Sequence, residues 1–379
     1  MDKPIRRIGI LTGGGDCPGL NAVIRAVTLD ALHEGLEVVG FLDGYLGLIE
    51  NKTRSLGPAD VVDIISEGGT ILGTSNKGSP FRYPIGEDVQ GKVRYGDVCD
   101  RCIETVRATG INGLIVIGGD GTMTIASQLA DRCAPLDLPV IGIPKTIDND
   151  LYGTTLTFGF LTAVSIATEA LDRLRTTAAS HHRVMVLEVM GRNAGWIALY
   201  SGVAGGADVI LIPEAPFSFD ALAEDIRRRM KNGNTHVLVV VAEGATATGG
   251  EQVVARRDES SPDPVRLGGI GRHVADTVEK MTGVESRYVV LGHVQRGGSP
   301  VAADRILGTQ FGHHAVRLLM SGAKGRMVAL KSMGSADGST LSDVPLSEPA
   351  GRQRLVGFGA GEHPLVTAAR AVNTSFGSR

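Results

Sequence analysis

Glycines, a lysine and carboxylates follow two apolar runs in positions that suit chemistry on phosphate groups. The segment Gly118–Thr122 (GGDGT) follows the run 114–117, and the segment Pro144–Asp150 (PKTIDND) follows the run 140–143. Glycines let backbone amides approach phosphates, while carboxylates hold Mg²⁺ or accept a proton. Loops at the ends of buried strands are where open α/β sheets bind ligands. We therefore expect phosphoryl-transfer chemistry.

The carboxylates of these two loops each allow two interpretations. Asp120 stands between glycines, where it could contact magnesium or cap a helix that is expected from Thr122. Asp148 and Asp150 are two residues apart on a loop expected to be extended, so their side chains could face the same cleft. One could then accept a proton while the other orients metal-bound water. Paired loop aspartates are also common turn formers, and both interpretations stay open at this point.

A third glycine-rich turn follows the first apolar run. Residues 12–21 read TGGGDCPGLN, a strand–glycine–helix pattern that suits an anion at the start of a helix. The pattern lacks the Gly-Lys-Ser/Thr of a Walker A loop and the third glycine of a dinucleotide fingerprint. Alone it is as typical of a tight turn as of a phosphate site. The glycines at 118–121 favour the phosphate site.

Cationic and polar residues flank three further apolar runs. They are His181-His182-Arg183, Met190-Gly191-Arg192-Asn193, and Arg287 with His293-Val294-Gln295-Arg296. Arginines can bind phosphate oxygens in a bidentate way, which suits a sugar phosphate. Any one of them alone would be interpreted as a surface residue, but their recurrence at strand ends weakens that interpretation. Glu243 either binds sugar hydroxyls or lies on the surface, and the two interpretations are equally open.

The elements that must position these residues alternate between short apolar runs and helix-like stretches. The runs expected to be strands are Ile8–Leu11, Val38–Leu42, Leu114–Ile117, Val140–Ile143, Val184–Val189, Val209–Ile212, Val237–Val241 and Tyr288–Leu291. The stretches expected to be helices are Asn21–His33, Ala163–Leu174, Phe219–Lys231 and Ile306–Met320. This alternation predicts an α/β protein with parallel sheets covered on both faces. Two sheets fit 379 residues better than one, with a division near 155–160.

Composition narrows the classes of partner and compartment. The net charge of −3 gives no support for binding nucleic acid or an anionic membrane, and no apolar run is long enough to span a bilayer. Cys99 and Cys102 have metal-like spacing, but no second Cys or His pair completes a site, so two ordinary helical cysteines are expected. A cytoplasmic protein is predicted. The polar segment 244–269 is expected to be a surface excursion.

Six sequence blocks, taken in order, resemble the 6-phosphofructokinase family. They are GGDCPGLN at 14–21, GGTILGT at 68–74, GGDGT at 118–122, PKTIDND at 144–150, EVMGR at 188–192 and LGHVQRGGSP at 291–300. The resemblance implies two Rossmann-like parallel-sheet lobes with the active site in the cleft between them. It implies that residues 1–158 with about 295–340 bind nucleotide and Mg²⁺, and that 159–294 with about 341–379 bind sugar phosphate. It also implies a homotetramer, or otherwise a homodimer.

The resemblance further implies transfer of a phosphoryl group from ATP to the 1-hydroxyl of fructose 6-phosphate, giving fructose 1,6-bisphosphate. Asp148 matches the catalytic base, with Gly121 and Lys145 nearby, and Asp120 matches the Mg²⁺ ligand. The implied donor-binding residues are Gly15, Tyr45, Asn76, Lys77, Gly118, Gly119, Asp120, Gly121 and Thr122. The implied sugar phosphate residues are Thr146, Asp148, Met190, Gly191, Arg192, Glu243, His293 and Arg296, with Arg183 and Arg287 completing a neighbouring subunit's site.

Two positions disagree about the donor. Gly121 resembles the ATP users of the family, because pyrophosphate users place Asp there, whereas Lys145 resembles the pyrophosphate type. A carboxylate at 121 would repel and crowd an α-phosphate, but a lysine at 145 attracts phosphate from either donor. ATP is therefore favoured, and a pyrophosphate-dependent phosphotransferase is the alternative. A non-catalytic, sugar-phosphate-binding subunit is less favoured, because the chain keeps Asp120, Thr146, Asp148, Arg192 and Arg296.

Two further departures from the family pattern concern cations. Asn76 stands where many ATP users have an arginine that bridges the two phosphates, and Lys77 beside it could replace that charge. The effector pocket of allosteric bacterial members is matched at Arg25 and Arg175, but cations are missing at Leu29, Pro58 and Asn234. Weak or absent regulation by phosphorylated effectors is predicted.

Overall fold

The chain divides into two compact units, and it passes from one unit to the other several times along the sequence. The computed structural model describes residues 4–76, 78–257, 265–335 and 338–378. The first unit contains Met1–Thr146, Leu151–Gly159 and Arg296–Arg352, and the second contains Ile147–Asp150, Phe160–Gln295 and Gln353–Arg379. Which unit binds nucleotide and which binds sugar phosphate stays a prediction.

The first unit is built on a seven-stranded sheet, as far as the described residues show, with the strand order β15-β14-β7-β6-β1-β2-β3. The strands are β1 (Arg7–Thr12), β2 (Glu37–Phe41), β3 (Thr53–Leu56), β6 (Gly113–Gly118), β7 (Val140–Pro144), β14 (Arg326–Ser335) and β15 (Gly338–Pro345). Neighbours pair in parallel except at the two edges, where β3 and β15 run antiparallel. The central strands are fully buried, which explains their continuous apolar sequences.

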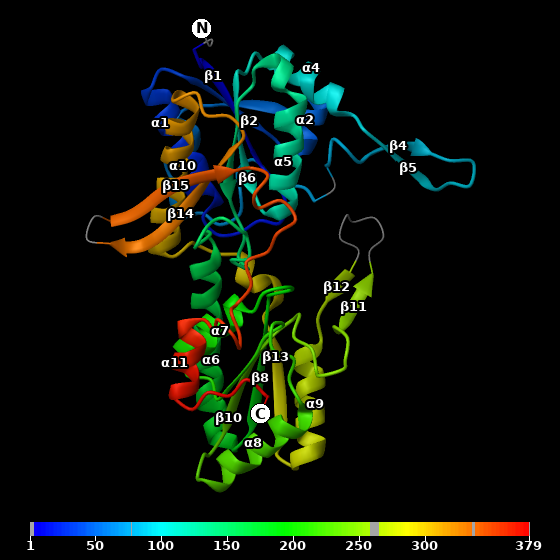
Figure 1. Cartoon of the computed structure of the whole chain (residues 1–379), viewed down its shortest axis with the longest axis vertical. Helices are drawn as coiled ribbons and strands as arrows, with labels where there is room; N and C mark the ends of the chain where they lie inside the picture. The colour runs from blue at the N-terminus through cyan, green and yellow to red at the C-terminus, as the bar shows by residue number, and fades with distance from the viewer. Residues whose placement is uncertain (1–3, 77, 258–264, 336–337, 379) are drawn as a thin grey trace. The chain divides into compact units, whose positions relative to one another are not determined.

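Helices cover both faces of this sheet (Figure 1). They are α1 (Leu20–His33), α2 (Tyr45–Glu50), α3 (Pro58–Val61), α4 (Cys99–Thr109), α5 (Asp120–Arg132) and α10 (Ala302–Met320), with short 3₁₀ turns at Ile64–Ser66 and Ala134–Leu136. Helices α2, α4 and α5 share one apolar core with the sheet, while α1 and α10 pack against each other. A separate antiparallel hairpin, β4 (Tyr83–Glu87) and β5 (Val93–Gly96), precedes α4.

The second unit contains a four-stranded parallel sheet, in its described part, with the order β13-β8-β10-β9. The strands are β8 (Val184–Val189), β9 (Val209–Leu211), β10 (Val237–Ala242) and β13 (Ser286–Val290). The helices are α6 (Phe160–His181), α7 (Trp196–Ala204), α8 (Phe219–Lys231), α9 (Ile270–Thr282) and α11 (Pro364–Ala371), with a 3₁₀ turn at Gly292–Arg296. A small hairpin, β11 (Val254–Arg257) and β12 (Val265–Leu267), lies apart from the sheet.

The core of the second unit follows the alternation of side chains along each strand. Val184 and Val186 of β8 face a core with apolar side chains of α8 and α9, among them Leu222 and Val274. Met185, between those two valines, belongs to a different apolar cluster on α6. Successive side chains therefore point to opposite faces, and both faces are covered by helices.

The predicted α/β class with two largely parallel sheets is confirmed. Each of the eight predicted strands and the four predicted helices is present, with ends shifted by up to seven residues. Strand β15 and helix α11 were not predicted from the sequence, and the predicted surface excursion 244–269 contains the hairpin of β11 and β12. No helix among the described residues is both long enough and apolar enough to cross a membrane.

Candidate active site

Three loops of the first unit meet because their strands are neighbours in one parallel sheet. Strands β1, β6 and β7 are adjacent, so the loops that follow them leave from the same edge. The amide of Gly13 donates to the carbonyl of Ile117 (2.8 Å), and the amide of Lys145 donates to the carbonyl of Gly118 (2.9 Å). The loops Gly13–Gly15, Gly118–Thr122 and Lys145–Thr146 thus form one cluster, as the sequence predicted.

Polar groups surround the glycine turn of this cluster. A methyl group added at Gly14, which has φ +78°, would lie 3.5 Å from both Lys145 Nζ and Thr122 Oγ1. The ammonium of Lys145 donates to the carbonyl of Gly15, and only 4% of the lysine is exposed. At Gly13 an added methyl would come within 2.8 Å of Thr122 Oγ1, so this turn requires glycine. A buried cation, a hydroxyl and open backbone make a suitable cradle for phosphate oxygens.

Helix α5 places Asp120 and Gly121 at its first turn. The helix begins at Asp120, and Gly119 is the capping residue without a side-chain bond, so the alternative that Asp120 caps a helix from Thr122 is wrong. Instead, Asp120 Oδ1 accepts a hydrogen bond from the amide of Gly351 (2.9 Å). Gly121 is exposed, and an added methyl there would meet no heavy atom within 4 Å. This open space is compatible with a donor larger than pyrophosphate.

Two other predicted residues contact the same loops. Tyr45 is buried, and its hydroxyl donates to the carbonyl of Thr122 (2.9 Å). Arg296 donates from its guanidinium to the carbonyl of Asp16 (3.1 Å), so in the structure it lies beside the glycine turn of the first unit. Asn76 is exposed, with Oδ1 4.0 Å from a methyl added at Gly14. Lys77 lies outside the described residues.

The loop that carries Asp148 is bent and partly buried. Residues 147–150 belong to the second unit, whereas Thr146 belongs to the first, where its carbonyl accepts a bond from the Thr157 hydroxyl (2.7 Å). Asn149 is buried and has φ +52°, in the left-handed region. The loop is therefore not extended. The reason for expecting the Asp148 and Asp150 side chains to face the same side, the alternation of side chains along extended backbone, does not apply. Both aspartates are half-buried.

The predicted sugar phosphate residues of the second unit follow neighbouring strands. Met190, Gly191 and Arg192 come after β8, Glu243 comes after β10, and His293 comes after β13. The β8 and β10 loops are joined by a hydrogen bond from the Gly244 amide to the Gly191 carbonyl (3.1 Å). A methyl added at Gly244 would overlap the carbonyl oxygen of Arg192, at 1.8 Å, so glycine is required for this approach.

Side chains fix two of these residues. The guanidinium of Arg192 donates to the carbonyl of Val265, and the amide of Met190 donates to Oε1 of the buried Gln295 (2.8 Å). The structure therefore groups the predicted residues into two sets. Those around the glycine turn, with Arg296, lie in the first unit, and those around β8, β10 and β13 lie in the second.

Arg183 and Arg287, predicted to complete a neighbouring subunit's site, share one carboxylate in the single chain. Arg183 forms an ion pair with Glu285 (2.8 Å), and Arg287 also pairs with Glu285 and with Glu279 (3.5 Å). The hydrogen bond from Arg183 lowers the pKa of the Glu285 carboxyl below its ordinary value. Both arginines thus lie close together on the second unit, Arg183 directly before β8 and Arg287 as the second residue of β13. This is the amino end of these parallel strands, whereas Met190 and His293 follow their carboxyl ends.

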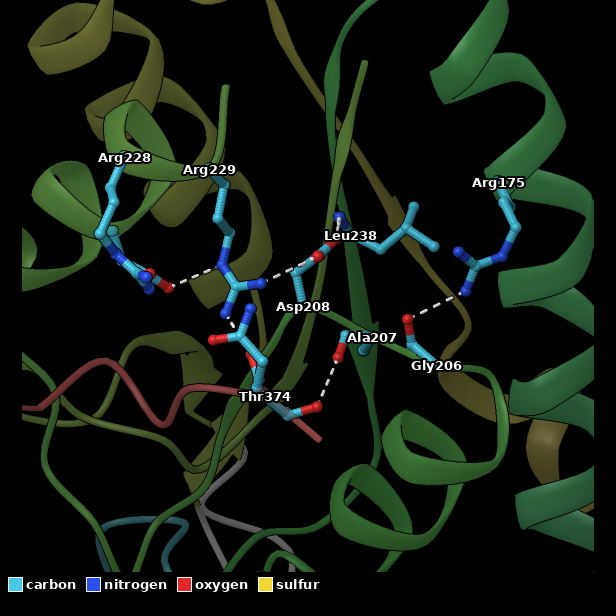
Figure 2. A network of polar contacts seen from close by, with 10 residues as sticks. Arg175, Gly206, Ala207, Asp208, Arg228, Arg229, Leu238 and Thr374 are labelled. Atoms are coloured by element: carbon cyan, nitrogen blue, oxygen red, sulfur yellow. Dashed lines mark hydrogen bonds and ion pairs between the residues drawn. The ribbon is translucent and has the colours of Figure 1, made fainter. Parts of the chain in front are cut away.

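A cavity of about 300 Å³ on the second unit contains two of the five positions compared with the effector pocket, Arg175 and Asn234. It is lined by Arg175, Asp208, Gly233, Asn234, Thr235 and His236. The guanidinium of Arg175 donates to the carbonyl of Gly206 at 3.0 Å (Figure 2). It also donates to the carbonyl of Gly205. Asp208 pairs with the buried Arg229 (3.1 Å) in the same network. The cavity therefore offers an arginine already bonded to backbone and a carboxylate beside it.

The described residues contain no group of three His, Cys, Asp or Glu side chains that could hold a metal by themselves. Mg²⁺, however, usually takes one or two carboxylates and completes its shell with substrate phosphates and water. Asp120, half-buried beside the glycine loops, fits that requirement. Burial raises the pKa of the Cys17 thiol to about 12, so this cysteine is no nucleophile near neutral pH.

Sequence reasoning missed the contribution of the C-terminal segment to the site. Gly351 contacts Asp120, and Arg354 contacts the loop 147–150. Both residues follow a stretch of sequence with no recognisable pattern. An arginine pair in the sequence RQR was the only signal, and it does not distinguish a buried cation from a surface one.

Comparison with known proteins identifies relatives along the whole chain. A family model described as phosphofructokinase matches residues 7–319. The chain is 50% identical over 378 residues to ATP-dependent 6-phosphofructokinase 2 of Clostridium perfringens, covering 99% of this chain and 100% of the relative. It is 47% identical over 355 residues to pyrophosphate--fructose 6-phosphate 1-phosphotransferase of Amycolatopsis methanolica, covering 92% and 96%. The structure of phosphofructokinase from Saccharomyces cerevisiae matches with a TM-score of 0.75 and 31% identity, covering 91% of this chain and 45% of the yeast chain.

Proposed function

Because the chain belongs to the phosphofructokinase family, we propose that it is a 6-phosphofructokinase that phosphorylates the 1-hydroxyl of fructose 6-phosphate. This is a reaction of glycolysis, and its product is fructose 1,6-bisphosphate. The observation that carries the proposal is the glycine turn Gly13–Gly15, around which Lys145 Nζ and Thr122 Oγ1 converge. Such a group of donors compensates the negative charge of the transferred phosphate without covalent chemistry.

The roles of the individual residues follow from their chemistry. Lys145, Thr122 and the backbone of the glycine loops bind the donor phosphates. Asp120 would hold Mg²⁺, which when bound neutralises charge on the phosphate oxygens. Asp148 accepts the proton of the attacking hydroxyl, since it is a half-buried carboxylate on the loop between β7 and α6.

ATP is the proposed donor. The open space at Gly121 leaves room for an α-phosphate, which pyrophosphate lacks. Lys145 does not distinguish ATP from pyrophosphate. Its ammonium donates to the Gly15 carbonyl in the glycine turn, where either donor would place phosphate oxygens. Relatives of similar identity carry names of both donor types, so the alternative is a pyrophosphate-dependent phosphotransferase.

Fructose 6-phosphate is assigned to the loops of the second unit. Arg192 and His293 would bind its phosphate and Glu243 its hydroxyls, while Met190 and Gly191 shape the loop after β8. Thr146 and Arg296, in the first unit, complete the proposed set. We also propose a cytoplasmic homotetramer in which Arg183 and Arg287, now paired with Glu285, reach a neighbouring subunit's substrate. A homodimer is the alternative assembly.

The replacement Asp148→Asn tests the role of the base directly. It keeps the shape of the side chain but cannot accept the proton, so kcat for fructose 6-phosphate should fall by about 10²–10⁴-fold with little change in KM. Asp150→Asn, on the same loop, is the matched control and should cause a much smaller loss. Near-normal turnover by Asp148→Asn would remove Asp148 as the base, and an inactive wild-type protein would refute the proposed function.

A further inference from the structure

The segment Gln353–Val356 belongs to the second unit, where Arg354 makes two contacts with Trp196. The indole Nε1 of Trp196 donates to the carbonyl of Arg354 (2.8 Å), and the Arg354 guanidinium stacks on the Trp196 ring with Cζ 4.1 Å from its centroid. Trp196 is only 2% exposed. Arg354 is therefore held through both its main chain and its side chain.

The same arginine contacts the loop that carries Asp148. Its backbone amide donates to the carbonyl of Asp150 (2.7 Å), and its guanidinium donates to the carbonyl of Asn149 (3.0 Å). These are the two peptide carbonyls that directly follow Asp148 along the chain. Arg354 thus supplies two donors to the backbone beside the proposed base.

The loop needs such support. Asn149 is buried and has φ +52°, a conformation that costs free energy for a residue with a side chain, although Asn tolerates it better than most. Residues 147–150 also belong to neither a helix nor a strand. A buried carbonyl in irregular backbone must find a donor, and Arg354 provides one at each of two consecutive residues.

The cation itself is costly to place here. Burial lowers the pKa of the Arg354 guanidinium below its ordinary value, because desolvation disfavours the charged form. Stacking on tryptophan and bonding to a carbonyl offset that cost. On the other side of the segment, the amide of Val356 donates to Glu214 Oε1 (2.8 Å), and the same carboxylate accepts from the Gly195 amide (3.1 Å). The segment is thereby fixed at Arg354 and again at Val356.

We infer that Arg354 is a positioning residue, which holds the backbone of loop 147–150 so that the Asp148 carboxylate is directed toward the substrate hydroxyl. This inference rests on the proposed function, in which Asp148 is the base. Arg354 acts through the loop backbone and needs no contact with substrate. Because misplacement by about 1 Å can cost about 10²-fold in rate, loss of Arg354 should lower kcat far more than it raises KM.

Trp196 provides a signal that is independent of activity. It is the single tryptophan among 379 residues, and its ring lies against the Arg354 guanidinium. Replacing Arg354 by Ala should therefore change the tryptophan emission of the whole protein. Arg370 offers a matched control, because it stacks on Phe358 (4.8 Å) in the same C-terminal region and pairs with Glu362 (3.4 Å).

The experiment compares wild-type protein, Arg354→Ala and Arg370→Ala in full-length form, with fructose 6-phosphate, Mg²⁺ and the donor that wild type uses. We expect Arg354→Ala to lose about 10–100-fold in kcat with KM changed less than about threefold, and to have altered Trp196 emission. Millimolar guanidinium ion, which fits the vacated place on Trp196, should restore part of kcat, whereas ammonium should not. Arg370→Ala should keep kcat and emission.

The outcomes separate the two hypotheses. A wild-type protein that turns over neither ATP nor pyrophosphate would refute the proposed function and this inference together. Wild-type turnover combined with undiminished kcat in Arg354→Ala would refute the role of Arg354 alone. A loss of kcat that guanidinium does not relieve, or that Arg370→Ala shares to the same extent, would also overturn it.

Discussion

The replacement Gly121→Asp should shift the donor preference toward pyrophosphate without harming the fold. An added methyl at this position meets no heavy atom within 4 Å, so a larger side chain is accommodated. Gly121 lies in the first turn of α5, where a carboxylate interacts favourably with the helix dipole, by about 0.3–1 kcal/mol. Asp is only slightly better than Gly as a helix former, so little is gained beyond this interaction. The midpoint of thermal unfolding should therefore stay the same or rise.

The expected effect on catalysis comes from charge. Two like charges 4 Å apart interact by about 4 kcal/mol at an effective dielectric constant of about 20. Because Gly121 is exposed and salt screens such pairs, we expect roughly half of this, about 2 kcal/mol, between a carboxylate at 121 and the α-phosphate of ATP. That corresponds to a loss of about 30-fold in kcat/KM for ATP. Pyrophosphate has no α-phosphate of a nucleotide to repel, so its kcat/KM should not fall.

The assay is the initial rate of fructose 1,6-bisphosphate formation at several ATP and pyrophosphate concentrations, for wild type, Gly121→Asp and Gly121→Ala. The alanine variant adds a side chain without charge, and it should resemble wild type with ATP because the space is open. If Gly121→Asp used ATP as well as Gly121→Ala does, the α-phosphate would not lie near position 121. The reasoning that assigns the donor from this glycine would then be refuted.

Two further predictions concern pH and regulation. Burial raises the pKa of the Glu214 carboxyl in the folded protein, so its contribution to stability is present below the ordinary pKa and is lost as pH rises through the raised value. Urea unfolding from about pH 4 to about pH 8 should thus show Glu214→Gln gaining stability relative to wild type as pH rises; a constant difference would contradict this. For regulation, Arg175 is bonded to the Gly206 carbonyl and Asn234 supplies no cation, so phosphoenolpyruvate and ADP should leave sugar-phosphate cooperativity nearly unchanged. A strong shift in the fructose 6-phosphate saturation curve would disprove it.

The parts of the fold that were predictable are those whose burial is written into the sequence. Strands such as β6 and β10 are buried on both faces and appear as unbroken apolar runs. By contrast, β4 is mostly exposed, and β15 carries few apolar residues. Neither sequence therefore shows the pattern of apolar residues that would predict a strand. Their pairing depends on a partner strand instead of on a core.

The same distinction applies to the candidate site. The glycine loops and the loop of Asp148 were predictable because they stand directly after buried strands. The role of Arg354 was not predictable, because the Asn149 carbonyl to which its guanidinium donates lies 205 positions earlier in the chain. Nothing local in the sequence marks an arginine as stacked on a distant tryptophan, and only tertiary structure brings the two together. Similarly, the left-handed Asn149 overturned an expectation that assumed extended backbone.

The most direct test of the proposed function is one comparison of donors. Purified full-length protein is assayed with fructose 6-phosphate and Mg²⁺, and the initial rate with ATP is compared with the rate with pyrophosphate at matched concentrations. The open position at Gly121 predicts turnover with both the sugar phosphate and ATP, and a clear preference for ATP. A large preference for pyrophosphate would contradict the assignment of the donor, and the absence of turnover with either would contradict the proposed activity itself.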